Sequence, residues 1–231
     1  MFKGKTILAI IPARGGSKGL PRKNIKVLGG KPLMVWTIEE AKRNKFIDRV
    51  IVSTDDSEIA QIAKSCGGEV PFMRPVELAT DKAGMTEVIN DALGRIGKEY
   101  DIVILLQPTS PFRSSEDIDN ALELLILKDA KAVVAVCEVD HHPYWSNELP
   151  PDGSMKDFLK KEAINTQRQD LRDFYRINGA IYLAYVPYLK EHKGFFGDGT
   201  FAYIMPRERS VDIDNENDFQ FAEFLMTERP K

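Results

Sequence analysis

The sequence predicts an α/β protein in which a mostly parallel sheet is covered by helices on both faces, giving three α/β/α layers. Apolar runs rich in β-branched residues recur along the chain and are nearly continuous, which is typical of strands buried on both faces. Between them lie longer segments with apolar residues three and four positions apart, which is the spacing of amphipathic helices. Because strands and helices alternate, we expect parallel strands joined by helical crossovers.

Five apolar runs are expected to form the strands, and four periodic segments the helices. The strand runs are KTILAIIPA (5–13), DRVIVSTD (48–55), DIVILLQPT (101–109), AVVAVCEV (132–139) and NGAIYLAYV (178–186). The helical segments span residues 32–44, 57–66, 85–100 and 115–128. Asp56 or Ser57, and Ser114 or Ser115, stand where N-caps of the second and fourth helices belong.

We expect residues 1–231 to form one domain that contains an inserted excursion over residues 140–176. This segment is polar, contains three prolines and has no clear buried strand. It also carries more aromatic residues than a solvated loop needs, which favours packing against a partner subunit or a substrate. These aromatic residues are Tyr144, Trp145, Phe158, Phe174 and Tyr175.

Composition gives no reason to expect a nucleic-acid or membrane partner. The chain has 32 Lys and Arg against 35 Asp and Glu, a net charge of −3. No apolar run approaches the roughly 20 residues that span a bilayer, so we expect a cytoplasmic protein. Cys66 and Cys137 lack the CxxC spacing of a structural zinc site, and we interpret them as small buried hydrophobic residues.

A basic, glycine-rich loop follows the first predicted strand. Between Met1 and Ile38 the chain has no Asp or Glu, while the loop carries three glycines (Gly15, Gly16, Gly19) and four cations (Arg14, Lys18, Arg22, Lys23). Glycines let backbone N–H groups approach a ligand, and clustered cations bind polyphosphates. The loop has neither GxxxxGK[ST] nor GxGxxG with a later acid, so kinase and dinucleotide loops are excluded. The alternative is an exposed turn with solvated lysines.

A pair of aspartates near the C-terminus is the second chemical feature. In VDIDNEND, Asp212 and Asp214 alternate on an extended segment, so both carboxylates face one side. Two oxygen ligands with open positions suit Mg²⁺ bound to phosphates. The alternative is a solvated turn or a cap for a helix beginning near Glu216. A phosphatase of the haloacid-dehalogenase class is disfavoured, because its DxD follows the first strand.

The loop PARGGSKGLPRKN resembles the signature of the acylneuraminate cytidylyltransferases, which make CMP-sialic acids from CTP and a nonulosonic acid. The resemblance continues through IVSTDDSEIA, RPVELATD, LLQPTSPFRS, HHP, RQ, RINGAIYL, FF and DIDNENDF, and so covers nearly the whole chain. It implies a Rossmann-like nucleotidyltransferase sheet. The related family that activates 3-deoxy-manno-octulosonate shares IPAR but continues differently after it, which disfavours that sugar.

The resemblance also assigns roles to individual residues. For CTP it implies Ala13, Arg14, Ser17, Lys18, Lys23, Asn24, Arg74, Thr86 and Gln107. Among these, Arg74 and Gln107 are expected to follow predicted strands. For catalysis it implies Arg14, Lys23, Asp212 and Asp214, with the two aspartates as Mg²⁺ ligands and one of them a candidate to accept the proton. For the sugar it implies Gln107, Arg168, Asn178, Tyr182, Phe195 and Phe196.

The identity of the sugar stays open between sialic, legionaminic and pseudaminic acids. After HHP the chain has Tyr144 and Trp145, where a basic residue near position 145 is expected in a sialate-activating bacterial enzyme. Phe195 and Phe196 would wall the acyl pocket in the family, although ordinary core packing explains them equally from the residues alone. The histidines at 141, 142 and 192 lie outside the predicted strand ends and are weak candidates for acid-base catalysis.

The function expected from the sequence is a Mg²⁺-dependent cytidylyltransferase whose sugar hydroxyl attacks the α-phosphorus of CTP and releases pyrophosphate. The excursion resembles the dimerisation segment of the family, so we expect a homodimer. Two rival classes are a non-catalytic nucleotide-sugar binding module and a dehalogenase-class phosphatase. The first would keep the basic loop and lose the aspartate pair, and the second would hydrolyse a simple phosphate ester without CTP.

Overall fold

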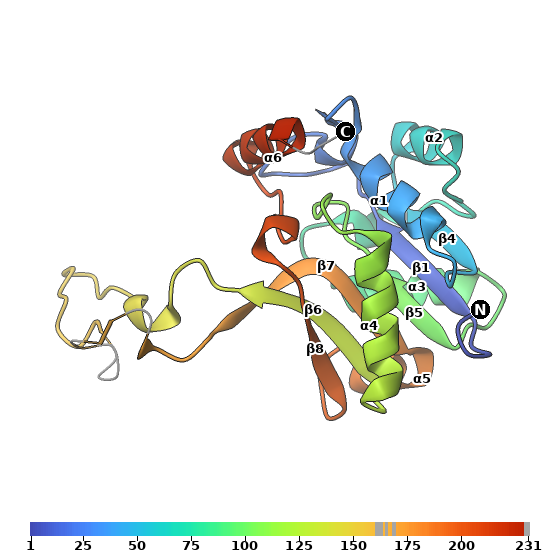
Figure 1. Ribbon diagram of the computed structural model, residues 1–231. Helices are drawn as coiled ribbons and strands as arrows, with labels where there is room; N and C mark the ends of the chain where they lie inside the picture. Colours follow the sequence, from blue (N-terminus) through green and yellow to red (C-terminus); the bar gives the residue numbers. More distant parts are fainter. Residues whose placement is uncertain (160–163, 165, 168–169, 229–231) are drawn as a thin grey trace.

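A six-stranded sheet with the order β4-β1-β5-β7-β6-β8 forms the centre of the protein (Figure 1). The computed structural model describes residues 1–159, 164, 166–167 and 170–228. The strands are β1 (Ile7–Pro12), β4 (Arg49–Ser53), β5 (Ile102–Leu105), β6 (Ala132–Glu138), β7 (Tyr175–Tyr185) and β8 (Thr200–Ile204). The five predicted strands are all present, and β8 is an additional one.

The sheet is mostly parallel, as predicted, with β7 as the reversed strand. β1 pairs in parallel with β4 and β5, and β6 pairs in parallel with β8. β7 pairs antiparallel with both β5 and β6. The chain returns from β6 to β7 through the excursion and not through a helical crossover, and such a return places the second strand antiparallel to the first.

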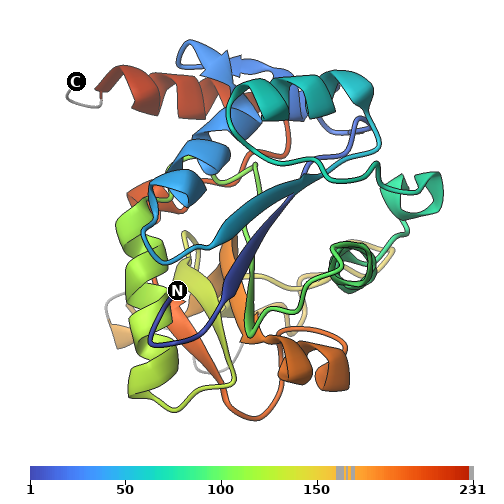
Figure 2. The same cartoon turned by 90° about the vertical axis from the view of Figure 1, so that its right-hand side faces the viewer.

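Helices cover both faces of the sheet, which confirms the predicted three-layer architecture (Figure 2). One face packs against α1 (Leu33–Arg43), α2 (Ser57–Ser65) and α4 (Ser115–Leu127). The other packs against α3 (Met85–Arg95) and α5 (Val186–His192). Successive strand residues point to opposite faces, so Ile7 and Ala9 enter the first core while Leu8 and Ile10 enter the second.

The helix ends agree with the predicted caps, with one correction. Asp56 accepts hydrogen bonds from the backbone N–H groups of Glu58 and Ile59, and Ser114 accepts one from Asp117. The helix expected over residues 85–100 ends at Arg95, and Gly97 follows in the left-handed region with φ +65°. Cys137 is buried as predicted, whereas Cys66 is only partly buried.

A third apolar cluster lies beyond the carboxyl ends of the central strands. It joins Leu20, which follows β1, and Phe112, which follows β5, to Ile213 and to Phe219 of α6 (Glu216–Glu228). The short hairpin of β2 (Val27–Leu28) and β3 (Lys31–Pro32) packs here too. This cluster draws the basic loop and the C-terminal aspartate segment to the same end of the sheet. Short 3-10 helices span Lys23–Ile25, Val76–Ala79, Pro143–Trp145 and Arg207–Arg209.

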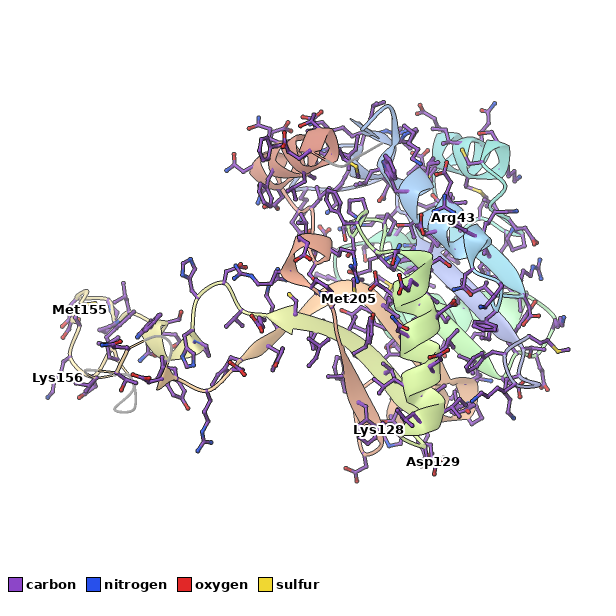
Figure 3. The ribbon with its side chains drawn as sticks, in the orientation of Figure 1. Arg43, Lys128, Asp129, Met155, Lys156 and Met205 are labelled. Carbon is purple, nitrogen blue, oxygen red and sulfur yellow. The ribbon has the colours of Figure 1, made fainter. Side chains whose placement is uncertain are left out.

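The segment between β6 and β7 extends away from the sheet, with Met155 and Lys156 near its far end (Figure 3). It spans residues 139–174, because Tyr175 and Arg176 belong to β7 and not to the predicted excursion. At its base, His142 contacts the rings of Tyr144 and Phe174 with centroids 4.6 Å apart in each case. Farther out the segment exposes the apolar side chains of Leu149, Met155, Leu159 and Ile164.

Candidate active site

A cavity of about 400 Å³ lies at the carboxyl ends of β1 and β5. This is the place where open α/β sheets bind ligands. It collects most of the residues that the sequence placed around a nucleotide, although they come from four distant segments. Its lining includes Pro12, Arg14, Ser17, Lys23, Asn24, Arg74, Leu78, Thr80, Asp81, Ala83, Met85, Val88, Gln107, Pro108, Thr109, Asp212 and Asp214.

The basic loop is held in place by its backbone and by neighbouring carboxylates. The Gly15 N–H donates to Asp55 Oδ1 at 3.0 Å, and the amide of Asn24 donates to the Arg14 carbonyl at 2.9 Å. Gly19 approaches the second aspartate so closely that a Cβ there would lie 2.3 Å from the Asp214 carbonyl oxygen. Glycine is therefore required at position 19 for the loop to meet the aspartate segment.

Each of the four cations in the loop is paired with an acid from elsewhere in the chain. Arg14 Nη2 and Lys18 Nζ each lie 2.6 Å from an oxygen of Asp81. Lys23 Nζ lies 2.9 Å from Asp214 Oδ1 and also donates to the Ile213 carbonyl at 2.6 Å. The loop itself contains no acidic residue, and the acids that pair with its cations come from distant segments of the chain. The local charge pattern of the loop does not indicate which acids these are.

The fourth cation of the loop, Arg22, faces away from the cavity. Its guanidinium contacts Asp56, the N-cap of α2, and Glu58 in the first turn of α2, and it does not line the pocket. Arg22 adopts the left-handed backbone conformation with φ +58° at the start of the 3-10 helix that carries Lys23. From the sequence we expected all four cations to bind one anion. In the structure Arg22 instead helps to hold the loop through its ion pairs.

The two aspartates share the cavity but differ in environment. Between them Ile213 is fully buried, so its side chain anchors the segment while both carboxylates face the pocket. Burial raises the pKa of Asp212, and the nearby charge of Asp214 raises it further, against the opposing effects of a Thr109 hydrogen bond and Lys23. Asp214 is largely exposed and is held by Lys23.

The donor set fits a hard cation. Asp212 Oδ1 is buried and has no hydrogen-bond partner among the described residues. A buried carboxylate oxygen without a partner is costly unless a ligand satisfies it. Within the described part of the chain no group of three or more His, Cys, Asp or Glu residues could hold a metal, so a cation bound by Asp212 and Asp214 would take its other ligands from phosphate and water.

Gly179 lies close to the side chains of Gln107 and Asp212. Gly179 lies in β7 with φ +76°, and a Cβ there would lie 2.6 Å from Gln107 Oε1 and 3.4 Å from Asp212 Oδ2. The glycine therefore admits both side chains to the same space. Sequence reasoning selected Gln107 and Asp212 and missed Gly179, although it stands inside the quoted strand NGAIYL.

Arg74 also lines the cavity, as do apolar side chains of α3 and of the segment before it. Its guanidinium donates to Ser53 Oγ at 3.0 Å and also to the Ser53 carbonyl, and burial lowers the pKa of Arg74 to about 10. Arg74 was expected to follow a strand, but it follows only an isolated bridge between Ile51 and Glu69. The apolar lining comes from Leu78 and Ala83 of that segment and from Met85 and Val88 of α3, and such a surface suits a nucleobase.

Several residues predicted to bind ligands do not line this cavity. Ala13 is buried and Lys18 is exposed beside Asp81. Thr86 lies in the first turn of α3, where its hydroxyl faces Gly194. Asn178 is fully buried, and its amide donates to Ser210 Oγ at 2.9 Å.

The aromatic residues predicted for the sugar pocket lie on β7 and after α5. Tyr182 and the buried Phe195 pack with ring centroids 5.5 Å apart, whereas Phe196 is 56% exposed. Burial raises the pKa of Tyr182, and so does the charge of Asp212, which places Tyr182 near the aspartate pair. Arg168 lies outside the described residues.

Two further features of the site escaped sequence reasoning. Asp81 lies in the segment RPVELATD, which was assigned to the nucleotide pocket only through Arg74. Arg176, which β7 places near the aspartates, donates to the Ser210 carbonyl at 3.3 Å and lowers the pKa of Asp212 by its charge. A search for acids that could balance the basic loop would have returned many candidates without singling out Asp81.

Comparison with known proteins agrees with this geometry. A family model described as cytidylyltransferase matches residues 8–226. A relative from Legionella pneumophila named CMP-N,N'-diacetyllegionaminic acid synthase is 36% identical over 230 residues, which cover 95% of this chain and 96% of the relative. A relative from Escherichia coli O18:K1:H7 named N-acylneuraminate cytidylyltransferase is 42% identical over 217 residues, which cover 94% of this chain but only 51% of that longer protein.

A solved structure shares the fold. The CMP:2-keto-3-deoxy-manno-octonic acid synthetase complexed with CTP matches with a TM-score of 0.69 and 18% identity, covering 96% of this chain and 98% of that one. Among the described residues, no helix is long and apolar enough to cross a membrane.

Proposed function

The chain belongs to the cytidylyltransferase family, and we propose that it transfers CMP from CTP to the anomeric hydroxyl of a nonulosonic acid. The sugar oxygen forms a bond to the α-phosphorus, the bond from that phosphorus to the bridging oxygen of the β-phosphate breaks, and pyrophosphate leaves. The hydroxyl proton passes to a base or to water. The observation that carries this proposal is the convergence of the basic loop and the aspartate pair on one cavity at the strand ends.

The side chains of the cavity suit positioning and charge neutralisation, which dominate catalysis of phosphoryl transfer. Arg14 and Lys23 would bind the triphosphate, with Lys18 at the exposed rim. Ser17 and Asn24 lie on the same loop, and Asn24 holds the loop by its amide. Arg74 and the apolar residues before α3 would receive the base, where a donor and an acceptor are needed to distinguish cytosine from uracil.

Mg²⁺ is proposed as the metal, with Asp212 and Asp214 as its protein ligands. When bound, it would supply neutralisation of the phosphate charge near the attacking oxygen. Asp212 offers its unpartnered buried oxygen, and Asp214 offers a carboxylate that Lys23 keeps oriented. Lys23 Nζ, close to Asp214, can then turn to the phosphates without leaving the site. One of the two aspartates is also our candidate to accept the proton.

The sugar is proposed to bind beside Gln107 and Tyr182, close to the aspartate pair. Both relatives described above act, by their names, on nonulosonic acids, one of them the diacetyl form of legionaminic acid. Legionaminic and pseudaminic acids therefore stay alternatives to sialic acid for this chain. Arg168 is proposed to bind the carboxylate of the sugar. Asn178 and Phe195 would support the pocket indirectly, Asn178 by its hydrogen bond to Ser210 and Phe195 by its packing against Tyr182.

A homodimer is proposed on the basis of the projecting segment 139–174. Its exposed apolar side chains would be buried against a second copy, which is the usual fate of such surface. The dimer would bring this segment, which includes Arg168, toward a sugar pocket, and the exposed Phe196 after α5 is proposed to belong to the same pocket. A cytoplasmic location and a single domain over residues 1–231 complete the proposal and stay predictions from the sequence.

The test is pyrophosphate release with CTP, Mg²⁺ and a panel of sialic, legionaminic and pseudaminic acids. UTP and 3-deoxy-manno-octulosonate serve as negative substrates. We expect release with CTP and at least one nonulosonic acid, and its loss in Asp214→Ala with an unchanged circular dichroism spectrum. Glu223→Ala, an exposed acid on α6 outside the cavity, is the matched control and should keep full activity. Full activity of Asp214→Ala would reject the metal assignment.

A further inference from the structure

Asp81 links the segment before α3 to the basic loop, and both segments line the cavity. It lies between the 3-10 helix Val76–Ala79 and α3, in the segment whose apolar residues are proposed to receive the base. Its Oδ1 lies 2.6 Å from Arg14 Nη2, and its Oδ2 lies 2.6 Å from Lys18 Nζ. One carboxylate thus spans two cations of the basic loop, with a separate oxygen for each.

The position of this carboxylate is informative because the same two cations are expected to bind the phosphates of CTP. A carboxylate and a phosphate oxygen make the same charge-assisted hydrogen bonds to guanidinium and ammonium groups. Arg14 also contacts the Ala79 carbonyl through Nη1 at 3.4 Å, which aligns its guanidinium with the Asp81 segment. Asp81 and the distal phosphates therefore compete for the same donors.

We propose that Asp81 is a specificity-determining residue that acts as an internal competitor for the β- and γ-phosphates. It weakens the binding of CTP and of pyrophosphate, and leaves unchanged the binding of ligands that stop at the α-phosphate. This inference rests on the proposed function for its identification of CTP. The competition itself requires only an anion that reaches Arg14 and Lys18.

The environment of Asp81 favours a displaceable contact over a fixed structural one. The side chains of Asp81 and Lys18 are 41% and 86% exposed, and ion pairs at such sites are weak and readily exchanged. Within the described part of the chain, the carboxylate of Asp81 pairs only with Arg14 and Lys18. Asp55 and Asp56, by contrast, accept backbone N–H groups and hold the loop and the start of α2.

The competition weakens the binding of the substrate CTP and of the product pyrophosphate alike. CTP must displace Asp81 before its distal phosphates reach both cations, so its affinity is reduced. After the reaction Asp81 can return to Arg14 and Lys18, and this return favours the departure of pyrophosphate. CMP does not carry the distal phosphates, and its affinity should be independent of Asp81.

The experiment measures equilibrium binding of CTP, CMP and inorganic pyrophosphate by titration calorimetry without added metal. Asp81→Asn keeps the shape of the side chain and removes its charge. We expect it to bind CTP and pyrophosphate about three- to tenfold more tightly, the range set by two exposed ion pairs, with CMP binding unchanged. Asp81→Glu retains the charge and should keep the weak wild-type affinities for CTP and pyrophosphate.

Glu77→Gln is the matched control for a general change in charge. It removes an exposed acid of the 3-10 helix Val76–Ala79, in the same segment as Asp81, that does not line the cavity. It should leave all three affinities unchanged. Equal tightening in Glu77→Gln and Asp81→Asn, or unchanged or weaker pyrophosphate binding in Asp81→Asn, would overturn the proposal.

The two proposals fail in different ways. If the wild type makes no CMP-sugar from any acid of the panel but Asp81→Asn still binds pyrophosphate more tightly, the competition stands and the proposed function falls. If the wild type makes a CMP-sugar and pyrophosphate binding is the same in both proteins, the function stands and the role of Asp81 falls.

Discussion

Asp117 is fully buried and Asp212 is partly buried with one carboxylate oxygen enclosed, yet their surroundings shift their pKa values in opposite directions. Asp117 is fully buried at the start of α4 and accepts hydrogen bonds from Ser114, Tyr203 and Arg209. Burial alone would raise the pKa of Asp117, but the hydrogen bonds from Arg209 and Ser114 and the charge of Arg209 lower it below its usual value. Burial raises the pKa of Asp212, whose Oδ1 has no partner among the described residues.

Asp117 stabilises the fold through its hydrogen bonds, whereas the surroundings of Asp212 suit the binding of a ligand. The partners of Asp117 come from α4, β8 and the 3-10 helix Arg207–Arg209, so one carboxylate ties three elements together. The segment that carries Asp212 is anchored by Ile213, which is buried in the third apolar cluster. Asp212 therefore adds little to the stability of the fold, and its unsatisfied oxygen indicates a binding role.

Replacement of Asp212 by asparagine tests whether this carboxylate serves ligand binding and not the stability of the fold. We expect Asp212→Asn to lower the rate of CMP transfer by about 1,000-fold or more, since one preorganised electrostatic contact in a site contributes effects of that order. Its free energy of unfolding at neutral pH should be unchanged within about 1 kcal/mol or slightly increased, because an uncompensated buried charge is removed. Pyrophosphate release and urea denaturation measure the two effects.

Exchange of Asp117 for asparagine should give the reverse pattern. Asp117→Asn leaves Arg209 without its buried partner, and breaking such a pair costs about 3 kcal/mol of unfolding free energy. The folded fraction should keep a rate of CMP transfer close to that of the wild type, because Asp117 does not line the cavity. A stable Asp117→Asn protein, or a folded one without activity, would contradict the distinction between the two aspartates.

The pH dependence of stability offers a smaller and more specific contrast. The pKa of Asp117 is lower in the folded protein than its ordinary value of 3.8. Its ionisation therefore stabilises the folded state fully above that value, and this contribution is lost as the pH falls through the ordinary pKa toward the lower folded one. We expect the wild type to lose stability between about pH 5 and pH 2 more steeply than Asp117→Asn does. Parallel denaturation curves across this range would show that Asp117 is not the group responsible.

The sequence predicted the fold well where the signal is local. The buried strands are continuous apolar runs and the helices have regular apolar spacing, so five strands and four helices were found and the mostly parallel sheet is confirmed. The edge strand β8 was missed because TFAYI is short and only partly buried, which leaves no continuous apolar run. The direction of β7 depends on the path of the excursion, for which residue spacing gives no signal.

The candidate site was predictable to a similar degree and for a similar reason. Arg14, Lys23, Asp212 and Asp214 were selected because their residue types and local spacing suit phosphates and a cation, and the fold brings them together in one cavity. Asp81 and Gly179 could not be selected, since their importance lies in what they approach across the fold. Arg22 is a cation of the same loop, but in the structure it pairs with Asp56 and Glu58 and does not line the cavity.

The sequence by itself determined the class of fold, the family and the two chemical groups that meet in the site. The fold class follows from apolar periodicity, and the two chemical groups follow from a glycine-rich run of cations and from two aspartates at alternate positions, all of which are properties of neighbouring residues. The family follows from the resemblance of motifs spread along the chain. Only the tertiary structure decided which acids oppose which cations and which buried carboxylate lacks a partner. Those properties depend on distances between segments far apart in the chain, and electrostatic and hydrogen-bonding energies depend on distance in space and on burial.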